Sequence, residues 1–139
     1  TLKTLEPPTW DRRFTVGVVG ASEGYPADYA RGSAISGLEE AGGVEDVVVF
    51  HAGTSASGDG VITSGGRVVC VSSMADDMET ARDRAYAAYD MIDWIGKFCR
   101  RDIGGRVESR KARVAEIMGS NAESGEGVEP SVPLGDARG

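Results

Sequence analysis

The sequence predicts an α+β domain, a small twisted antiparallel sheet with one amphipathic helix packed on it. Three observations predict this class. The first half of the 139-residue chain carries short β-branched runs separated by glycine turns. One stretch of helical periodicity follows them. Hydrophobic residues make up 40% of the chain, which is enough for one small core.

Four short strands are expected in the first half of the chain. Phe14–Val19 alternates apolar and small side chains, and Asp46–Phe50 is a compact β-branched run. Val61–Thr63 and Arg67–Ser72 flank a turn at Gly65-Gly66. Because glycine turns separate these runs, we expect a meander in which strands adjacent in sequence pair with each other.

The helix is expected over Met78–Ile95, where apolar residues recur every three or four positions and charges fill the other face. Asp76 is the expected N-cap, with Glu79 three residues later completing a capping box. Gly96 is placed to end the helix.

The domain itself is expected over residues 10–106. Residues 1–9 are interpreted as a linker from upstream domains, with Trp10 as an apolar anchor where the domain begins. Residues 107–118 could form a short second helix. Residues 119–139, rich in Gly, Ser, Glu and Pro, have the composition of a flexible tail.

The charge balance restricts the possible partners. A net charge of −7 argues against a general nucleic-acid binder and against binding to an anionic membrane surface. No apolar run approaches membrane-spanning length, and no signal peptide opens the chain. We therefore expect a cytoplasmic protein that binds neither nucleic acid nor membrane, although a local arginine cluster could still hold one phosphate.

Cysteine and histidine are scarce. Cys70 and Cys99 lie far apart and are expected to be free thiols, and together with a single histidine they are too few for a structural zinc site. His51 is interpreted as a hydrogen-bonding residue at a strand end, because no nucleophile elbow supports a catalytic triad. The sequence thus predicts no catalytic residue and no metal site in this chain.

The sharpest chemical signal is a group of cations within ten residues of an acidic protein: Lys97, Arg100, Arg101 and Arg106. The guanidinium fork of arginine suits bidentate contact with phosphate. The functional interpretation is a subsite for a phosphate or phosphoribosyl group. The alternative is a solvated patch that pairs with Asp102 and Glu108, or a docking surface for another domain.

Two further features of the sequence each have two possible roles. Arg67 lies between a glycine pair and an apolar run. It either orients the phosphate or phosphoribosyl ligand or contacts an adjoining domain. The aromatic loop Gly24–Tyr29 is either a structural corner or an interface edge, and a structural corner is the favoured interpretation.

Several motifs in this order resemble one known family, the C-terminal domain of phosphoribosylamine–glycine ligase, also called glycinamide ribonucleotide synthetase. The matching segments are Gly24–Tyr29, Ile35–Gly37, Val49–Thr54, Thr63–Val71, Ala81–Tyr86 and Phe98–Gly104. The resemblance runs from about Trp10 to Arg106. It departs from the family at Ala27, where glycine is usual, at Ser22-Glu23 and at Gly105.

The resemblance implies an enzyme of the ATP-grasp superfamily. Such ligases join phosphoribosylamine to glycine in de novo purine biosynthesis, using ATP and magnesium and activating glycine as an acyl phosphate. The family's ATP and magnesium sites lie in N-terminal and ATP-grasp domains, so the resemblance implies no cofactor site in this chain. It also implies a C-terminal domain of the rudimentary hybrid-motif type, with an antiparallel sheet and a packed helix.

The resemblance also assigns site residues and partners. Basic residues at the positions of Arg100 and Arg101 face the substrate phosphate in related enzymes, and Arg67 joins them as a candidate substrate-binding residue. The expected partners are the remaining domains of the ligase and the phosphate of phosphoribosylamine or glycinamide ribonucleotide. The chain alone is expected to be inactive. The alternative is a free-standing binding or regulatory module with the same fold.

Overall fold

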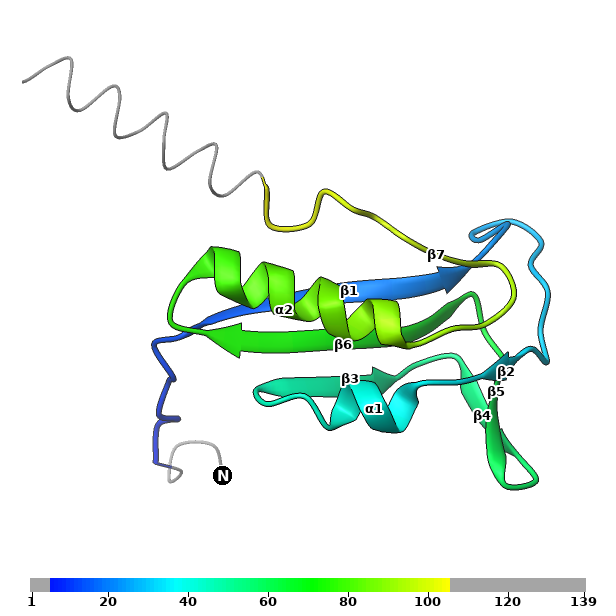
Figure 1. Cartoon of the computed structure of the whole chain (residues 1–139), viewed down its shortest axis with the longest axis horizontal. Helices are drawn as coiled ribbons and strands as arrows, with labels where there is room; N and C mark the ends of the chain where they lie inside the picture. Colours follow the sequence, from blue (N-terminus) through cyan, green and yellow to red (C-terminus); the bar gives the residue numbers. More distant parts are fainter. Residues whose placement is uncertain (1–5, 106–139) are drawn as a thin grey trace, which may run out of the picture. The chain divides into compact units, whose positions relative to one another are not determined.

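The computed structural model describes residues 6–105, which form two antiparallel sheets and two helices. The larger sheet has the strand order β3-β6-β1-β7 (Figure 1). Its strands are β1 (Phe14–Ser22), β3 (Val47–His51), β6 (Arg67–Ala75) and β7 (Lys97–Cys99). The smaller sheet has the order β2-β5-β4. Its strands are β2 (Ala34–Ile35), β4 (Thr54–Ser57) and β5 (Gly60–Thr63). The expected α+β class is confirmed.

Both helices lie on one face of the four-stranded sheet (Figure 1). Helix α2 (Met78–Met91) packs on β1 and β6, and α1 (Leu38–Gly42) packs on β3 and against α2. The core between helix and sheet is built from small helix residues and β-branched strand residues. Its fully buried members include Val18, Val69, Val71, Ala81, Ala85 and Ala88. No helix of the described residues covers the opposite face of this sheet.

The alanines of α2 allow the helix to approach the sheet closely. At Gly20 of β1 the approach leaves no space for a side chain, since an added Cβ would lie 2.6 Å from the Tyr89 ring and 2.7 Å from the Trp94 ring. These two rings meet edge-on with centroids 6.5 Å apart, a favourable arrangement for aromatic pairs. The helix and the sheet therefore approach each other closely where the end of α2 crosses β1.

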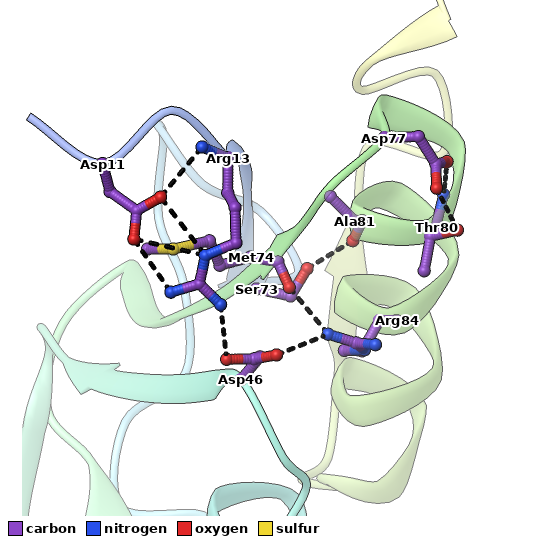
Figure 2. A network of polar contacts seen from close by, with 9 residues as sticks. All are labelled: Asp11, Arg13, Asp46, Ser73, Met74, Asp77, Thr80, Ala81 and Arg84. Atoms are coloured by element: carbon purple, nitrogen blue, oxygen red, sulfur yellow. Dashed lines mark hydrogen bonds and ion pairs between the residues drawn. The ribbon is translucent and has the colours of Figure 1, made fainter.

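A polar network ties α2 to the starts of β1 and β3, as Figure 2 shows. The Asp46 carboxylate accepts from Arg13 at 3.0 Å and from Arg84 at 3.2 Å. Arg84 also donates to the Met74 carbonyl oxygen at 2.7 Å. Beside it, the buried Ser73 hydroxyl donates to the carbonyl oxygen of Ala81. These contacts set the position of α2 along the sheet.

The predicted meander is wrong. Strand β1 pairs with β6 and β7, and β3 pairs with β6, so the large sheet is assembled from strands that are distant in sequence. The hairpin β4–β5 belongs to the separate small sheet. The reason lies in strand length: β1 and β6 each span nine residues, and pairing with each other lets them satisfy a long ladder of backbone groups.

The helix and its start at Met78 are confirmed, but its predicted N-cap and its predicted C-terminal end are wrong. Asp77, not Asp76, is the N-cap, and its carboxylate accepts from the Thr80 amide at 2.7 Å. The helix ends at Met91 because Ile92 is extended, with φ −86° and ψ 138°. Asp93 then forms an isolated bridge with Ser36, and Gly96, at φ 76°, turns the chain toward β7.

The expected anchor role of Trp10 is also wrong, because 82% of this residue is exposed. Residues 6–9 form neither helix nor strand, which is compatible with a linker. The expected helix over 107–118 and the expected tail over 119–139 lie outside the described residues. The proposed limits of the domain at 10 and 106 stay a prediction.

Candidate functional site

A hollow with a volume of about 580 Å³ lies beside Arg67, where β6 begins. We call it the Arg67 hollow. Its lining includes Val19, Tyr25, Ala52, Gly53, Gly66, Arg67 and Cys70. These residues come from β1, from the start of β6 and from the loops that follow β1 and β3. Strands distant in sequence thus bring an arginine, a tyrosine and bare backbone together.

Backbone hydrogen bonds fix the position of Gly53 in the lining of the hollow. The Gly53 amide donates to the Arg67 carbonyl oxygen at 2.7 Å, and the Gly53 carbonyl oxygen accepts from Ser64 at 2.8 Å and Gly65 at 3.1 Å. A Cβ on Gly53 would lie 2.6 Å from the Arg67 carbonyl oxygen and from the Gly65 Cα. The crossing of the two segments therefore requires glycine at position 53.

Tyr25 forms a wall of the hollow. Its ring lies directly over Gly66, where an added Cβ would be 2.2 Å from the Tyr25 Cδ2 atom. The loop is held by a bond from the Tyr25 amide to the Ser22 carbonyl oxygen at 3.1 Å, and by one from the Ser22 amide to Gly66 at 2.8 Å. The aromatic loop is thus a structural corner, as favoured from the sequence, and it also lines the hollow.

Arg67 owes its position to an irregularity in the β1–β6 ladder. Gly20 pairs with Val69 but Ala21 pairs with Arg67, so β6 contains one extra residue at this point. Such bulges redirect side chains at the ends of strands. Arg67 is exposed, and within residues 6–105 no carboxylate forms an ion pair with it. Its guanidinium is therefore available to an anion.

Arg100 and Arg101 lie after β7 and do not line the Arg67 hollow. Arg100 makes a bidentate pair with Asp102, at 2.9 and 2.6 Å, as the alternative interpretation of the cation cluster anticipated. The hydrogen bonds that Arg100 donates to the Asp102 carboxylate raise the pKa of Arg100. This pair is exposed on both sides, so water and an incoming phosphate could both compete for it.

Arg101 is held on the helix side of the sheet. It makes a bidentate pair with Asp90 of α2, at 3.1 and 2.6 Å, and lies over the rings of Tyr86 and Tyr89 at 5.4 and 5.7 Å. Hydrogen bonding to Arg101 lowers the pKa of Asp90, against the opposing effect of desolvation. The structure therefore separates Arg101 from Arg67, and their shared role in substrate binding stays a prediction.

Lys97 and Arg106 are the other two cations of the predicted cluster. Lys97 donates from Nζ to the Tyr89 carbonyl oxygen at 3.4 Å and to the Ile92 carbonyl oxygen, so it satisfies the C-terminal end of α2. Its ammonium group also lies 4.6 Å from the centroid of the Tyr89 ring. Lys97 therefore has a structural role here. Arg106 lies outside the described residues.

His51 and the cysteines have local roles. His51 Nδ1 lies 3.0 Å from the Thr54 hydroxyl at the end of β3, as expected for a hydrogen-bonding residue at a strand end. Cys70 and Cys99 are free, and burial raises the pKa of the Cys70 thiol where it lines the hollow. Among residues 6–105, no three His, Cys, Asp or Glu side chains are placed to hold a metal ion. The same residues include no helix able to cross a membrane.

Sequence reasoning missed the contributions of Tyr25, Gly53 and Gly66 to a common hollow. The glycines are visible in the sequence, but their meaning depends on which backbone segment approaches each of them. Gly53 contacts a segment more than ten residues away, and Gly66 contacts a ring some forty residues earlier. The resemblance did include all three positions, and it was the one available signal.

The comparisons with known proteins agree with that resemblance. The family model for the phosphoribosylglycinamide synthetase C domain matches residues 15–106. The phosphoribosylamine–glycine ligase of Vibrio cholerae is 50% identical over 104 residues, which cover 73% of this chain and 24% of the relative. The ligase of Pseudomonas aeruginosa is 48% identical over 103 residues, covering 74% and 24%.

A solved structure shares the fold. The crystal structure of phosphoribosylamine–glycine ligase from Thermotoga maritima matches with a TM-score of 0.60 and 32% identity, over 69% of this chain and 23% of that chain. The chain thus spans about a quarter of the length of the relatives it matches. By the family match, the sequence identity and the shared fold, this chain belongs to the family of phosphoribosylglycinamide synthetase C domains.

Proposed function

We propose that this chain serves as the C-terminal part of a phosphoribosylamine–glycine ligase, the enzyme that forms glycinamide ribonucleotide from phosphoribosylamine, glycine and ATP. The observation that carries the proposal is the family match over residues 15–106, together with identities near one half to ligases from two bacteria. In this role the chain contributes to purine biosynthesis as one domain of a cytoplasmic enzyme and is inactive alone.

Within that enzyme, the chain completes the substrate pocket. Arg67 is the best-placed candidate for the phosphate of phosphoribosylamine, because it lines a hollow and is unpaired within the described residues. Arg100 is exposed and could exchange its Asp102 partner for a phosphate. Arg101 would have to share its guanidinium with Asp90, so we assign it the weakest direct contact of the three.

ATP and magnesium belong, in this proposal, to the remaining domains of the ligase. Their binding requires carboxylates and phosphate-binding backbone held together in one place. The contribution of this chain is to orient the phosphoribosyl substrate toward that site, and orientation alone can supply a large part of the rate enhancement of a two-substrate reaction.

The test uses the complete ligase polypeptide that carries this sequence. Arg67→Ala should raise the KM for phosphoribosylamine about 10- to 100-fold, because a hydrogen bond to a charged group is worth about 1.5–3 kcal/mol. The KM for ATP should stay unchanged. Arg12→Ala, which removes an exposed arginine outside the sheets, is the matched control and should alter neither constant.

An unaltered KM for phosphoribosylamine in the Arg67 variant would remove Arg67 from the substrate site. If the complete natural protein forms no glycinamide ribonucleotide from the three substrates, the ligase assignment itself fails. The free-standing binding module would then be the better description of the chain.

A further inference from the structure

The uncovered face of the four-stranded sheet carries large apolar side chains. Val19 of β1 and Phe50 of β3 both pair with Cys70 of β6, so these three residues form one row across three strands. Val48 lies two residues before Phe50 and therefore on the same face. On the edge strand β7, Cys99 packs against the core, so its neighbour Phe98 points to the uncovered face. We call these five residues the open face.

The open face does not have the composition of a solvated surface. An antiparallel sheet covered on one side usually alternates apolar residues toward the core with polar residues toward water. Here the four large apolar residues of the open face keep between 42% and 55% of their surface exposed. The solvent side of α2, by contrast, carries polar and small residues such as Glu79, Asp83, Ala87 and Asp90. Four of the eight exposed large apolar residues among residues 6–105 thus gather on the open face, whereas Met91 and Ile95 lie apart from it, at the end of α2 and just after it.

Two observations indicate what covers the open face. In the relatives, the matching segment makes up about 24% of the polypeptide, so three quarters of each ligase lies outside it. In the solved structure from Thermotoga maritima the same fold is part of one longer chain. Segments joined in one polypeptide meet at high effective concentration, so a moderately apolar surface is enough for stable docking.

We propose that the open face is an interdomain interface, covered by the remaining polypeptide of the same ligase. This inference rests on the proposed function and names the surface through which the chain acts. The open face adjoins the Arg67 hollow, since Val19 and Cys70 belong to both. Docking there excludes water beside Arg67, and a lower local dielectric strengthens its attraction for an anion.

Cysteine labelling tests the interface directly. Phe50→Cys places a thiol on the open face, and Ala87→Cys places one on the exposed side of α2 as the matched control. Each variant is made in the 139-residue chain and in the complete ligase polypeptide. Maleimide labelling is followed over time, and peptide mass spectrometry separates the new thiol from Cys70 and Cys99.

The expected result is that Cys at position 50 reacts at least about tenfold more slowly in the complete ligase than in the 139-residue chain, because the core of an interface excludes water. Cys at position 87 should react at the same rate in both. Equal rates at position 50 in the two proteins would overturn the proposal. Protection at position 50 already present in the 139-residue chain and lost on dilution would also overturn it, in favour of a second copy.

Ligase assays on the same preparations separate the two proposals. Protection at position 50 in a complete polypeptide that forms no glycinamide ribonucleotide supports the interface and refutes the proposed function. An active polypeptide with an unprotected position 50 supports the function and refutes the interface.

Discussion

At the scale of single residues, the Arg67 hollow depends on two glycines whose lack of a side chain allows close backbone contact. Gly53 and Gly66 lack a Cβ, which allows one strand end to cross another and the Tyr25 ring to lie on the backbone. Arg67 lines the space that these backbone segments leave open. The hollow is a consequence of close backbone contact, and its shape should be sensitive to one added methyl group.

Gly53→Ala should therefore destabilise the chain by about 1–3 kcal/mol, the usual cost of overpacking a tight contact. The new methyl group would meet the backbone of Arg67 and Gly65 at 2.6 Å, and backbone cannot rotate away as a side chain can. Chemical denaturation measures the change. Gly42→Ala is the control, because nothing lies within 4 Å of an added Cβ there, and it should leave stability the same or higher.

The three candidate arginines show that residues close in sequence need not belong to the same site. Arg100 and Arg101 are adjacent in the chain, yet one pairs with Asp102 beside it and the other with Asp90 on α2. Arg67 is more than thirty residues away in sequence and lines the hollow without either of them. The sequence indicated cations whose chemistry suits phosphate, and that role stays a prediction, because the partner of each cation depends on tertiary packing.

At the scale of elements, α2 is the part of the fold that the sequence predicted best. Its periodicity alone indicated the buried face, and Ala81, Ala85 and Ala88 are fully buried there. Its N-cap and its C-terminal end were not predictable in the same way. Asp76 and Asp77 are both plausible caps, and only the backbone geometry selects Asp77, which is extended at φ −129° and ψ 156°.

The two aspartates provide a direct test of the cap. Asp77→Ala should lower the melting temperature of the chain by roughly 5 °C, since the Thr80 amide loses its acceptor. Asp76→Ala should leave it nearly unchanged. Thermal unfolding followed by circular dichroism measures both variants, and a larger effect at position 76 would show that the cap is misassigned.

At the scale of the whole molecule, the four-stranded sheet has one face toward the helices and one open. The register places Val71 of β6 on the helix side, opposite Val18, and Val48 of β3 on the other side. The two valines differ in burial, since Val71 is fully buried and Val48 is half exposed. One substitution made at both positions can therefore report which face is the core.

Val71→Thr should lower the free energy of unfolding by about 1–3 kcal/mol, because it buries a hydroxyl group at an apolar position. Val48→Thr should change stability by less than about 0.5 kcal/mol, as exposed positions usually do. Denaturant unfolding of the isolated 139-residue chain measures the two changes. In that chain a loss at position 48 as large as at position 71 would mean that the open face is already covered.

The sequence by itself determined the family, the α+β class, the position of the main helix and the presence of cations suited to phosphate. The family follows from the resemblance of its motifs, and the rest follows from local composition and spacing, which any segment carries regardless of its neighbours. Only the tertiary structure decided that β1 pairs with β6, that the open face stays apolar, and that Arg67 lines a hollow while Arg101 binds α2. Strand pairing and close backbone contact bring together residues that are far apart in the chain, and no local sequence pattern shows which of them will meet.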